Sequence, residues 1–162
     1  MRNKLSLTTP RQTIVAVIAG AILAWLLLAL YDALADFPPV VPWTVPLVFA
    51  LLGIAGIIYA AFLPKRREER KLSSQEAFIA LVAGKAMIIT GAVMAGGQAV
   101  YVMKYIDAIP AATPMQRVIN GSATIVAALI VAWAGSLIEK HLVVKDPPDD
   151  PPEERHTQGA PS

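Results

Sequence analysis

The chain has 162 residues, 56% of them hydrophobic and 16% charged, with a formal net charge of +2 and no cysteine. The lack of cysteine excludes disulfides and thiolate metal sites, and no basic-aromatic pattern suited to nucleic acid is present. The two histidines are His141 and His156, and no zinc-protease, phosphate-loop or serine-elbow motif occurs, so we expect no enzymatic activity, metal or cofactor.

Four apolar segments follow one another along the chain, at about residues 13–31, 45–63, 77–103 and 118–138. Each is long enough to cross a hydrocarbon core of about 30 Å, which needs about 20 residues of α-helix. The segment 77–103 carries only one charged residue, Lys85, and the other three carry none. The sequence therefore predicts an all-α, polytopic integral membrane protein, with a four-helix transmembrane bundle over residues 1–141.

The first segment has a competing interpretation as a cleavable export signal. It follows a basic N-terminus and precedes Ala33-Leu34-Ala35, which resembles a cleavage site. Its apolar run of about 18 residues exceeds the roughly 7–15 residues of a signal core, and Trp25 and Tyr31 suit a retained membrane anchor. We expect the helix to be retained.

Prolines and a capping motif predict where the next helices begin and end. Pro38, Pro39 and Pro42 predict a short, stiff loop, and Pro46 is expected in the first turn of the second helix. That helix is expected to stop at Pro64, before a basic loop. The third helix should begin after Ser73, which has capping-box spacing to Glu76.

Lysine and arginine are distributed unevenly between the two sides that these helices define. Two, Lys104 and Arg117, fall on the side of the first and third loops, and eleven fall on the side of the termini. Because basic segments stay in the cytoplasm, we expect both termini to be cytoplasmic. The eleven residues are Arg2, Lys4, Arg11, Lys65, Arg66, Arg67, Arg70, Lys71, Lys140, Lys145 and Arg155.

Small residues recur at helical spacing and mark where helices can approach closely in lipid. They are most frequent in the segment 77–103, so we expect this helix at the centre of the bundle. The residues expected at helix contacts are Gly84, Gly91 and Ala95 on one face of that segment, Gly96 beside them, and Ala16, Gly20 and Ala24 in the first segment.

Lys85 is the one ionisable residue inside the apolar segments, which makes it a candidate site residue. It lies roughly 12 Å from the cytoplasmic start of its helix, so it could reach the headgroups or pair with Glu139, and a role in binding a ligand is the alternative. Gln98 and Asn120 could line a small cavity, but we expect them to form hydrogen bonds between the third and fourth helices.

The composition changes after His141. Residues 142–162 are acidic and rich in proline, and such a composition cannot bury enough apolar surface to fold. We expect this segment to be a disordered cytoplasmic tail.

Several short motifs together resemble a family. They are Ala24-Trp25-Leu26-Leu27, the proline-rich turn 39–43, Gly84-Lys85-Ala86, and Leu137-Ile138-Glu139 leading to Asp146-Pro147-Pro148-Asp149-Asp150. In these the chain resembles a small actinobacterial family of four-helix membrane proteins of unknown function, DUF family 3180. The resemblance implies an inner-membrane protein, often encoded beside folate-biosynthesis genes, with no assigned activity.

These observations favour an accessory or scaffolding protein that acts through helix-helix contacts. Its expected partners are membrane lipids and either another membrane protein or further copies of itself. The alternative is an oligomeric channel or facilitator for a small solute, for example an anionic, folate-related one, which Lys85 would attract. Four helices seldom enclose a path alone, so transport would require at least a dimer.

Overall fold

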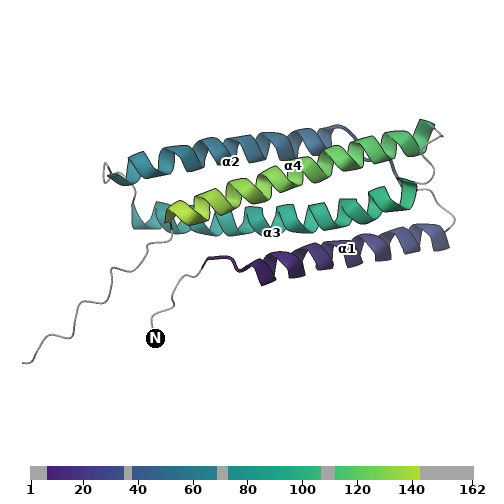
Figure 1. The fold of residues 1–162 in the computed structure, drawn as a ribbon, viewed down its shortest axis with the longest axis horizontal. Helices are drawn as coiled ribbons and strands as arrows, with labels where there is room; N and C mark the ends of the chain where they lie inside the picture. Colours follow the sequence, from purple (N-terminus) through teal and green to yellow (C-terminus); the bar gives the residue numbers. More distant parts are fainter. Residues whose placement is uncertain (1–6, 35–37, 69–72, 107–111, 143–162) are drawn as a thin grey trace, which may run out of the picture.

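The computed structural model describes residues 7–34, 38–68, 73–106 and 112–142. These residues form four helices, and each is long and apolar enough to cross a membrane, which confirms the predicted all-α, multi-pass architecture (Figure 1). The expected tail lies outside the described residues, apart from Leu142, which ends the last helix. The helices are α1 (Pro10–Ala33), α2 (Thr44–Glu68), α3 (Ser74–Tyr105) and α4 (Ala112–Leu142).

Side-chain caps fix the starts of α1 and α3. The Ser73 hydroxyl accepts a hydrogen bond from the Glu76 amide at 3.1 Å, and the Ser73 amide donates to the Glu76 carboxylate at 3.2 Å. Thr9 and Gln12 make a similar contact, at 3.1 Å, at the start of α1. Such caps satisfy amides that a helix leaves without intrahelical partners. The predicted start of α3 after Ser73 is confirmed.

The end of α2 differs from the prediction, because the helix passes through Pro64 and continues to Glu68. Proline removes one amide donor, but its neighbours hold this turn in place, since Ala60 and Leu63 are only 1% and 2% exposed. In a membrane helix, keeping the remaining backbone bonds costs less than exposing unpaired groups to lipid. Lys65 and Arg66 therefore extend the helix as exposed residues instead of beginning the loop.

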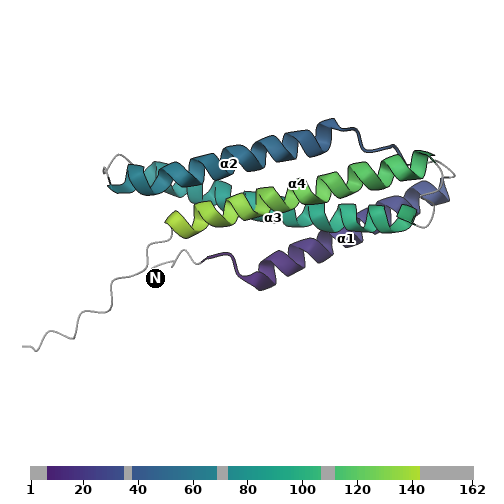
Figure 2. The ribbon, with the colours of Figure 1, turned by 45° about the horizontal axis from the view of Figure 1, so that its top comes forward.

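The helices lie in the order α1, α3, α4, α2, so that among the described helices only α3 and α4 are neighbours both in sequence and in space (Figures 1 and 2). α3 and α4 form the central pair, α1 packs on α3, and α2 packs on α4. The prediction placed the third helix alone at the centre, whereas it shares that position with α4. The described ends of the chain, at Leu7 and Leu142, lie at the same end along the helix axes, which we call the Glu139 end (Figure 1). The opposite end is the Tyr105 end.

Glycines bring the helix backbones close together along each seam of the row. Between α1 and α3, a Cβ atom on Gly20 would overlap the Val93 carbonyl oxygen, and one on Gly96 would overlap that of Val17. Between α3 and α4, a Cβ atom on Gly91 would lie 2.5 Å from the Ala128 carbonyl oxygen. Close backbone approach is the usual source of helix association in lipid, where apolar burial no longer drives it.

The remaining predicted contact residues lie on or beside these seams. Gly84 of α3 faces Gly135 of α4, with the expected Cβ position 3.0 Å from the Gly135 carbonyl oxygen. Ala16 and Ala95 are buried, at 7% and 8% exposure, and Ala24 faces Gly97 across the α1 and α3 seam.

Candidate functional site

At the Glu139 end, the structure brings Lys85 of α3 and Glu139 of α4 together. The Lys85 ammonium lies 3.6 Å from a Glu139 carboxylate oxygen, and the two side chains are 33% and 3% exposed. A buried carboxylate is costly unless it is paired and hydrogen-bonded. The ion pair therefore offsets both charges at this end of α3 and α4.

Thr8, which precedes α1, completes the environment of Glu139. Its amide donates a hydrogen bond of 2.6 Å to a Glu139 carboxylate oxygen, and its hydroxyl lies 3.1 Å from the same oxygen. Charge-assisted bonds to backbone amides are among the stronger hydrogen bonds in proteins. Glu139 therefore ties the start of α1 to α4, although the helices α1 and α4 do not otherwise pack together in the described residues.

At the Tyr105 end, Asn120 and Tyr101 hold the segment that connects α1 to α2. The Asn120 side-chain amide donates to the Val41 carbonyl at 2.7 Å, and the Tyr101 hydroxyl donates to the Pro39 carbonyl at 3.2 Å. Gln98 and Asn120 were expected to link α3 and α4 by hydrogen bonds. Instead Asn120 binds the connecting segment, and Gln98 Oε1 is buried without a hydrogen-bond partner among the described residues.

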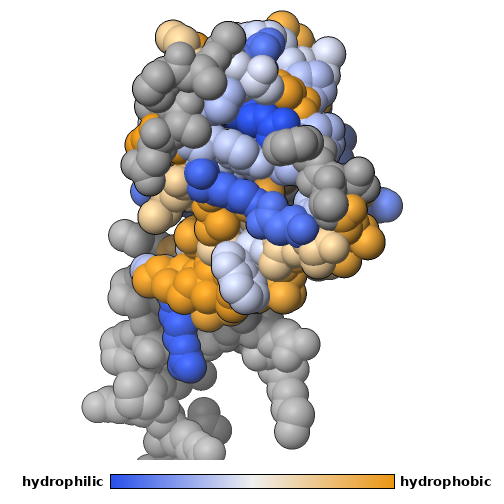
Figure 3. Space-filling model, turned by 90° about the vertical axis from the view of Figure 1, so that its right-hand side faces the viewer, coloured by the Kyte–Doolittle hydropathy of each residue, from blue (hydrophilic) through white to orange (hydrophobic). Residues whose placement is uncertain are grey.

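Charged residues also gather at the Tyr105 end, where Figure 3 shows hydrophilic residues among apolar ones. The Lys104 ammonium of α3 lies 2.6 Å from the Asp32 carboxylate of α1. The Arg117 guanidinium of α4 lies 4.7 Å from the centre of the Tyr105 ring, at a distance suited to a cation–π interaction. Arg117 is only 7% exposed, so the structure buries a residue that was expected in a loop.

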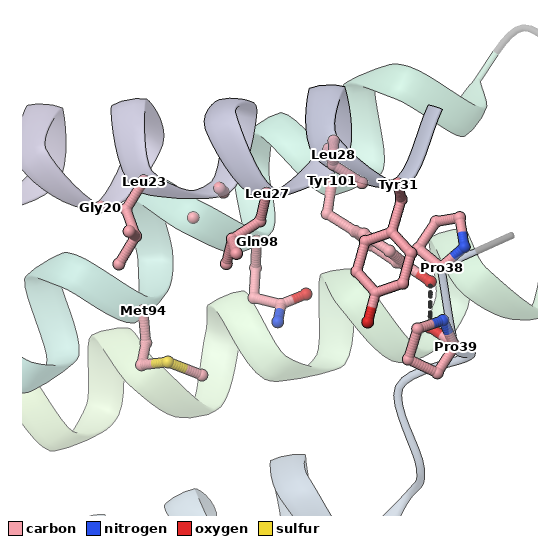
Figure 4. Close-up of a pocket in the computed structure, with 12 residues that line it drawn as sticks. Gly20, Leu23, Leu27, Leu28, Tyr31, Pro38, Pro39, Met94, Gln98 and Tyr101 are labelled. Carbon is pink, nitrogen blue, oxygen red and sulfur yellow. Dashed lines mark hydrogen bonds between the residues drawn. The ribbon is translucent and has the colours of Figure 1, made fainter. Parts of the chain in front are cut away.

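A cavity of about 290 Å³ lies between α1 and α3, near the Tyr105 end. Figure 4 shows Met94, Gln98 and Tyr31 following one another along it, with the Tyr101 bond to Pro39 at its end. The remaining lining residues are mostly apolar. They are Gly20, Leu23, Ala24, Leu27, Leu28, Pro38 and Gly97.

Comparison with known families decides the relationship that the sequence suggested. The family model described as "Protein of unknown function (DUF3180)" matches residues 13–146. This chain belongs to the DUF3180 family. No curated protein and no solved structure matches the chain.

The DUF3180 match includes Lys85, Glu139, Gln98 and Asn120, whereas Thr8 lies before it. Sequence reasoning missed Thr8 because a lone threonine before a helix has many possible partners, and this one is 131 residues away. It also missed Arg117, since a basic residue near the start of an apolar segment looks like an ordinary loop residue. Tyr105, the last residue of α3, was the available signal for an aromatic partner of this arginine.

Replacing Asn120 with leucine is expected to lower the free energy of unfolding of this DUF3180 protein by about 1–2 kcal/mol, because the Val41 carbonyl loses its donor. The exchange of the Val40 and Val41 amides with solvent should become faster, as measured by hydrogen exchange in detergent. The matched control is Thr124→Val, since the Thr124 hydroxyl bonds within its own helix to the Asn120 carbonyl at 2.8 Å. If Asn120→Leu and Thr124→Val accelerated exchange at Val40 and Val41 equally, the hydrogen bond from Asn120 to the Val41 carbonyl would not be what holds this segment.

Replacing Lys104 with glutamine should lower the free energy of unfolding by less than about 1 kcal/mol, because the Asp32 side chain is 61% exposed and solvent screens the pair. Unfolding measured at low and high salt would show this small effect shrinking further as salt rises. A loss of several kcal/mol would show that the pair holds α1 on α3.

Proposed function

We propose that this DUF3180 protein is a non-enzymatic accessory or scaffolding component of the bacterial inner membrane. It would act through helix-helix contacts with another membrane protein. The observation that carries this proposal is where the glycines of α3 make their close helix contacts. The glycines of α3 that could accept a partner helix are already occupied by α1 and α4.

The outer faces of α1 and α2 therefore remain for a partner. On α2 a row of large apolar side chains points away from α4, and each is about half exposed or more. On α1 the side chains of Ile18, Ile22 and Trp25 are exposed in the same way. In a membrane such faces contact lipid or another helix. The α2 row consists of Leu51, Ile54, Ile58 and Phe62.

We further propose that the Glu139 end faces the cytoplasm. Arg11, Lys65, Arg66 and Lys140 are exposed at this end, where basic residues favour the cytoplasmic side. Both described chain ends lie there as well, as an even number of spans requires.

The geometry favours this role over a channel or facilitator for an anionic solute. The Lys85 ammonium would have to attract the solute, but Glu139 offsets its charge at 3.6 Å. The contacts of Gly20 with Val93 and of Gly91 with Ala128 close the two seams of α3. A path would therefore have to form between copies of the chain.

Chemical crosslinking of the tagged, full-length protein in its native membranes tests the proposal. Purification and mass spectrometry should identify one different membrane protein in a stoichiometric adduct. Adducts consisting only of further copies of this chain would overturn the scaffolding role and favour an oligomeric path, which solute-uptake assays would then examine.

A further inference from the structure

The cavity between α1 and α3 has the length of one membrane leaflet. It extends along α1 from Gly20 to Tyr31, which at 1.5 Å per residue corresponds to roughly 16 Å, about half of a hydrocarbon core of about 30 Å. Its inner limit is the close contact of Gly20 with the Val93 backbone, and Pro38 and Pro39 line its other end. We propose that this cavity binds one chain of an anionic phospholipid from the leaflet at the Tyr105 end.

The walls of the cavity suit a hydrocarbon chain that passes one polar group. Leu23, Leu27 and Leu28 of α1 face Met94 of α3 across it. Gln98 is the amide in this lining, and a carboxamide in lipid is costly unless it is hydrogen-bonded. The Gln98 atom without a hydrogen-bond partner among the described residues is the acceptor Oε1, which an acyl ester cannot satisfy because it has no donor, so the apolar walls alone hold the chain here.

The positive charge beyond the end of the cavity that Pro38 and Pro39 line suits a phosphate. Met94, Gln98, Tyr101 and Tyr105 are spaced along one face of α3, so the line of the cavity leads to the Tyr105 ring. The rings of Tyr101 and Tyr105 are in edge-to-face contact with their centres 5.2 Å apart, and the Arg117 guanidinium lies over the Tyr105 ring, 4.7 Å from its centre.

Arg117 is the cation at this end that has no acidic partner among the described residues. Asp32 and Lys104 neutralise each other at 2.6 Å, whereas Arg117 Nη1 is buried and lacks a hydrogen-bond partner within the described part of the chain. A buried charge without a counter-charge is unfavourable, and a guanidinium is well matched to phosphate oxygens. An anionic headgroup would supply both the charge and the acceptors.

The groove between α2 and α4 provides an internal comparison. It has a volume of about 490 Å³ and is lined by residues such as Trp43, Leu47 and Ala50, without an amide or a charged side chain. A bilayer lipid can cover it, but nothing in its lining distinguishes one headgroup from another. Ala50 is therefore the position for a matched control.

The test uses the full-length protein in nanodiscs that contain phosphatidylglycerol with a photoactivatable group in one chain. Mass spectrometry then locates the labelled peptides, which should be those of Gly20–Tyr31 and Met94–Tyr101. Gly97→Leu fills the cavity, since a Cβ atom at Gly97 meets only ordinary contacts of 3.4 Å and longer. This variant should reduce labelling about tenfold, as expected when a chain-sized pocket is blocked, whereas Ala50→Leu should leave it unchanged.

The headgroup part of the proposal is tested with phosphatidylcholine that carries the same photoactivatable chain. Wild-type protein should label more strongly with phosphatidylglycerol, and Arg117→Gln should reduce that preference about tenfold, the effect of losing one hydrogen bond to a charged group. If Arg117→Gln does not fold, raising the salt concentration with wild-type protein should reduce the preference instead. Equal labelling by both lipids, or equal labelling of wild type and Gly97→Leu, would overturn the proposal.

Discussion

Replacing Gly91 with leucine is expected to lower the free energy of unfolding by about 3 kcal/mol, at the upper end of the usual cost of overpacking a core. The new Cβ atom would lie 2.5 Å from the Ala128 carbonyl oxygen and 2.9 Å from the Ala132 side chain. Because a backbone atom cannot rotate away, α3 and α4 would have to separate. Denaturant titration of the purified protein in detergent measures the loss.

Gly97→Leu is the matched control, because it places the same side chain on the same helix. Its Cβ atom would meet only the Gly20 carbonyl oxygen at 3.4 Å and the Ala24 side chain at 3.6 Å, both ordinary contacts. Its cost should stay below about 1 kcal/mol, as for a substitution that forces no overpacking. Equal losses for the two variants would show that α3 and α4 do not pack at this distance.

The second large effect is expected from separating Lys85 and Glu139. Lys85→Met leaves a carboxylate that is only 3% exposed without its ion pair, so we expect a loss of about 2–3 kcal/mol in the free energy of unfolding. Glu139→Gln should cost about 1 kcal/mol, because glutamine keeps an oxygen for the Thr8 amide and the 33% exposed Lys85 side chain can extend to the headgroups.

A double-mutant cycle separates the ion pair from the other contacts of the two residues. The double variant Lys85→Met with Glu139→Gln should lose about 1–2 kcal/mol less than the sum of the single variants, since neither charge is left alone. The matched control pairs Lys85→Met with Ser136→Ala. In the wild type, the Ser136 hydroxyl donates a hydrogen bond to the Trp133 carbonyl of its own helix. Strict additivity of the Lys85 and Glu139 variants would contradict the ion pair.

Features that depend on composition and local spacing could be predicted from the sequence. The four apolar segments became four helices, and the capping motif at Ser73 and Glu76 marked the start of α3. These features rest on physical effects within one or two helical turns. The end of α2 could not be predicted in that way, because the packing of Leu63 on other helices holds the chain helical beyond Pro64.

The candidate sites depend on contacts between distant segments, and these were predicted less completely. Glu139 was named as the partner of Lys85 because it is the acidic residue at the matching depth of the next helix. The bond from Asn120 to the Val41 carbonyl was not foreseen, since a backbone carbonyl in a proline-rich loop carries no sequence signal. The buried position of Arg117 depends in the same way on how α3 and α4 are aligned.

Position-specific photocrosslinking tests the central claim, which is that a partner protein binds the outer faces of the row. The chain would carry a photoreactive amino acid at Ile54 of α2 or Ile22 of α1, which are 51% and 54% exposed, or at Val131 of α4, which is fully buried. Irradiation of native membranes should give an adduct with a different membrane protein from Ile54 or Ile22 and only internal links from Val131. The claim would be contradicted if both outer positions yielded adducts with lipid alone, or if Val131 captured the partner as efficiently.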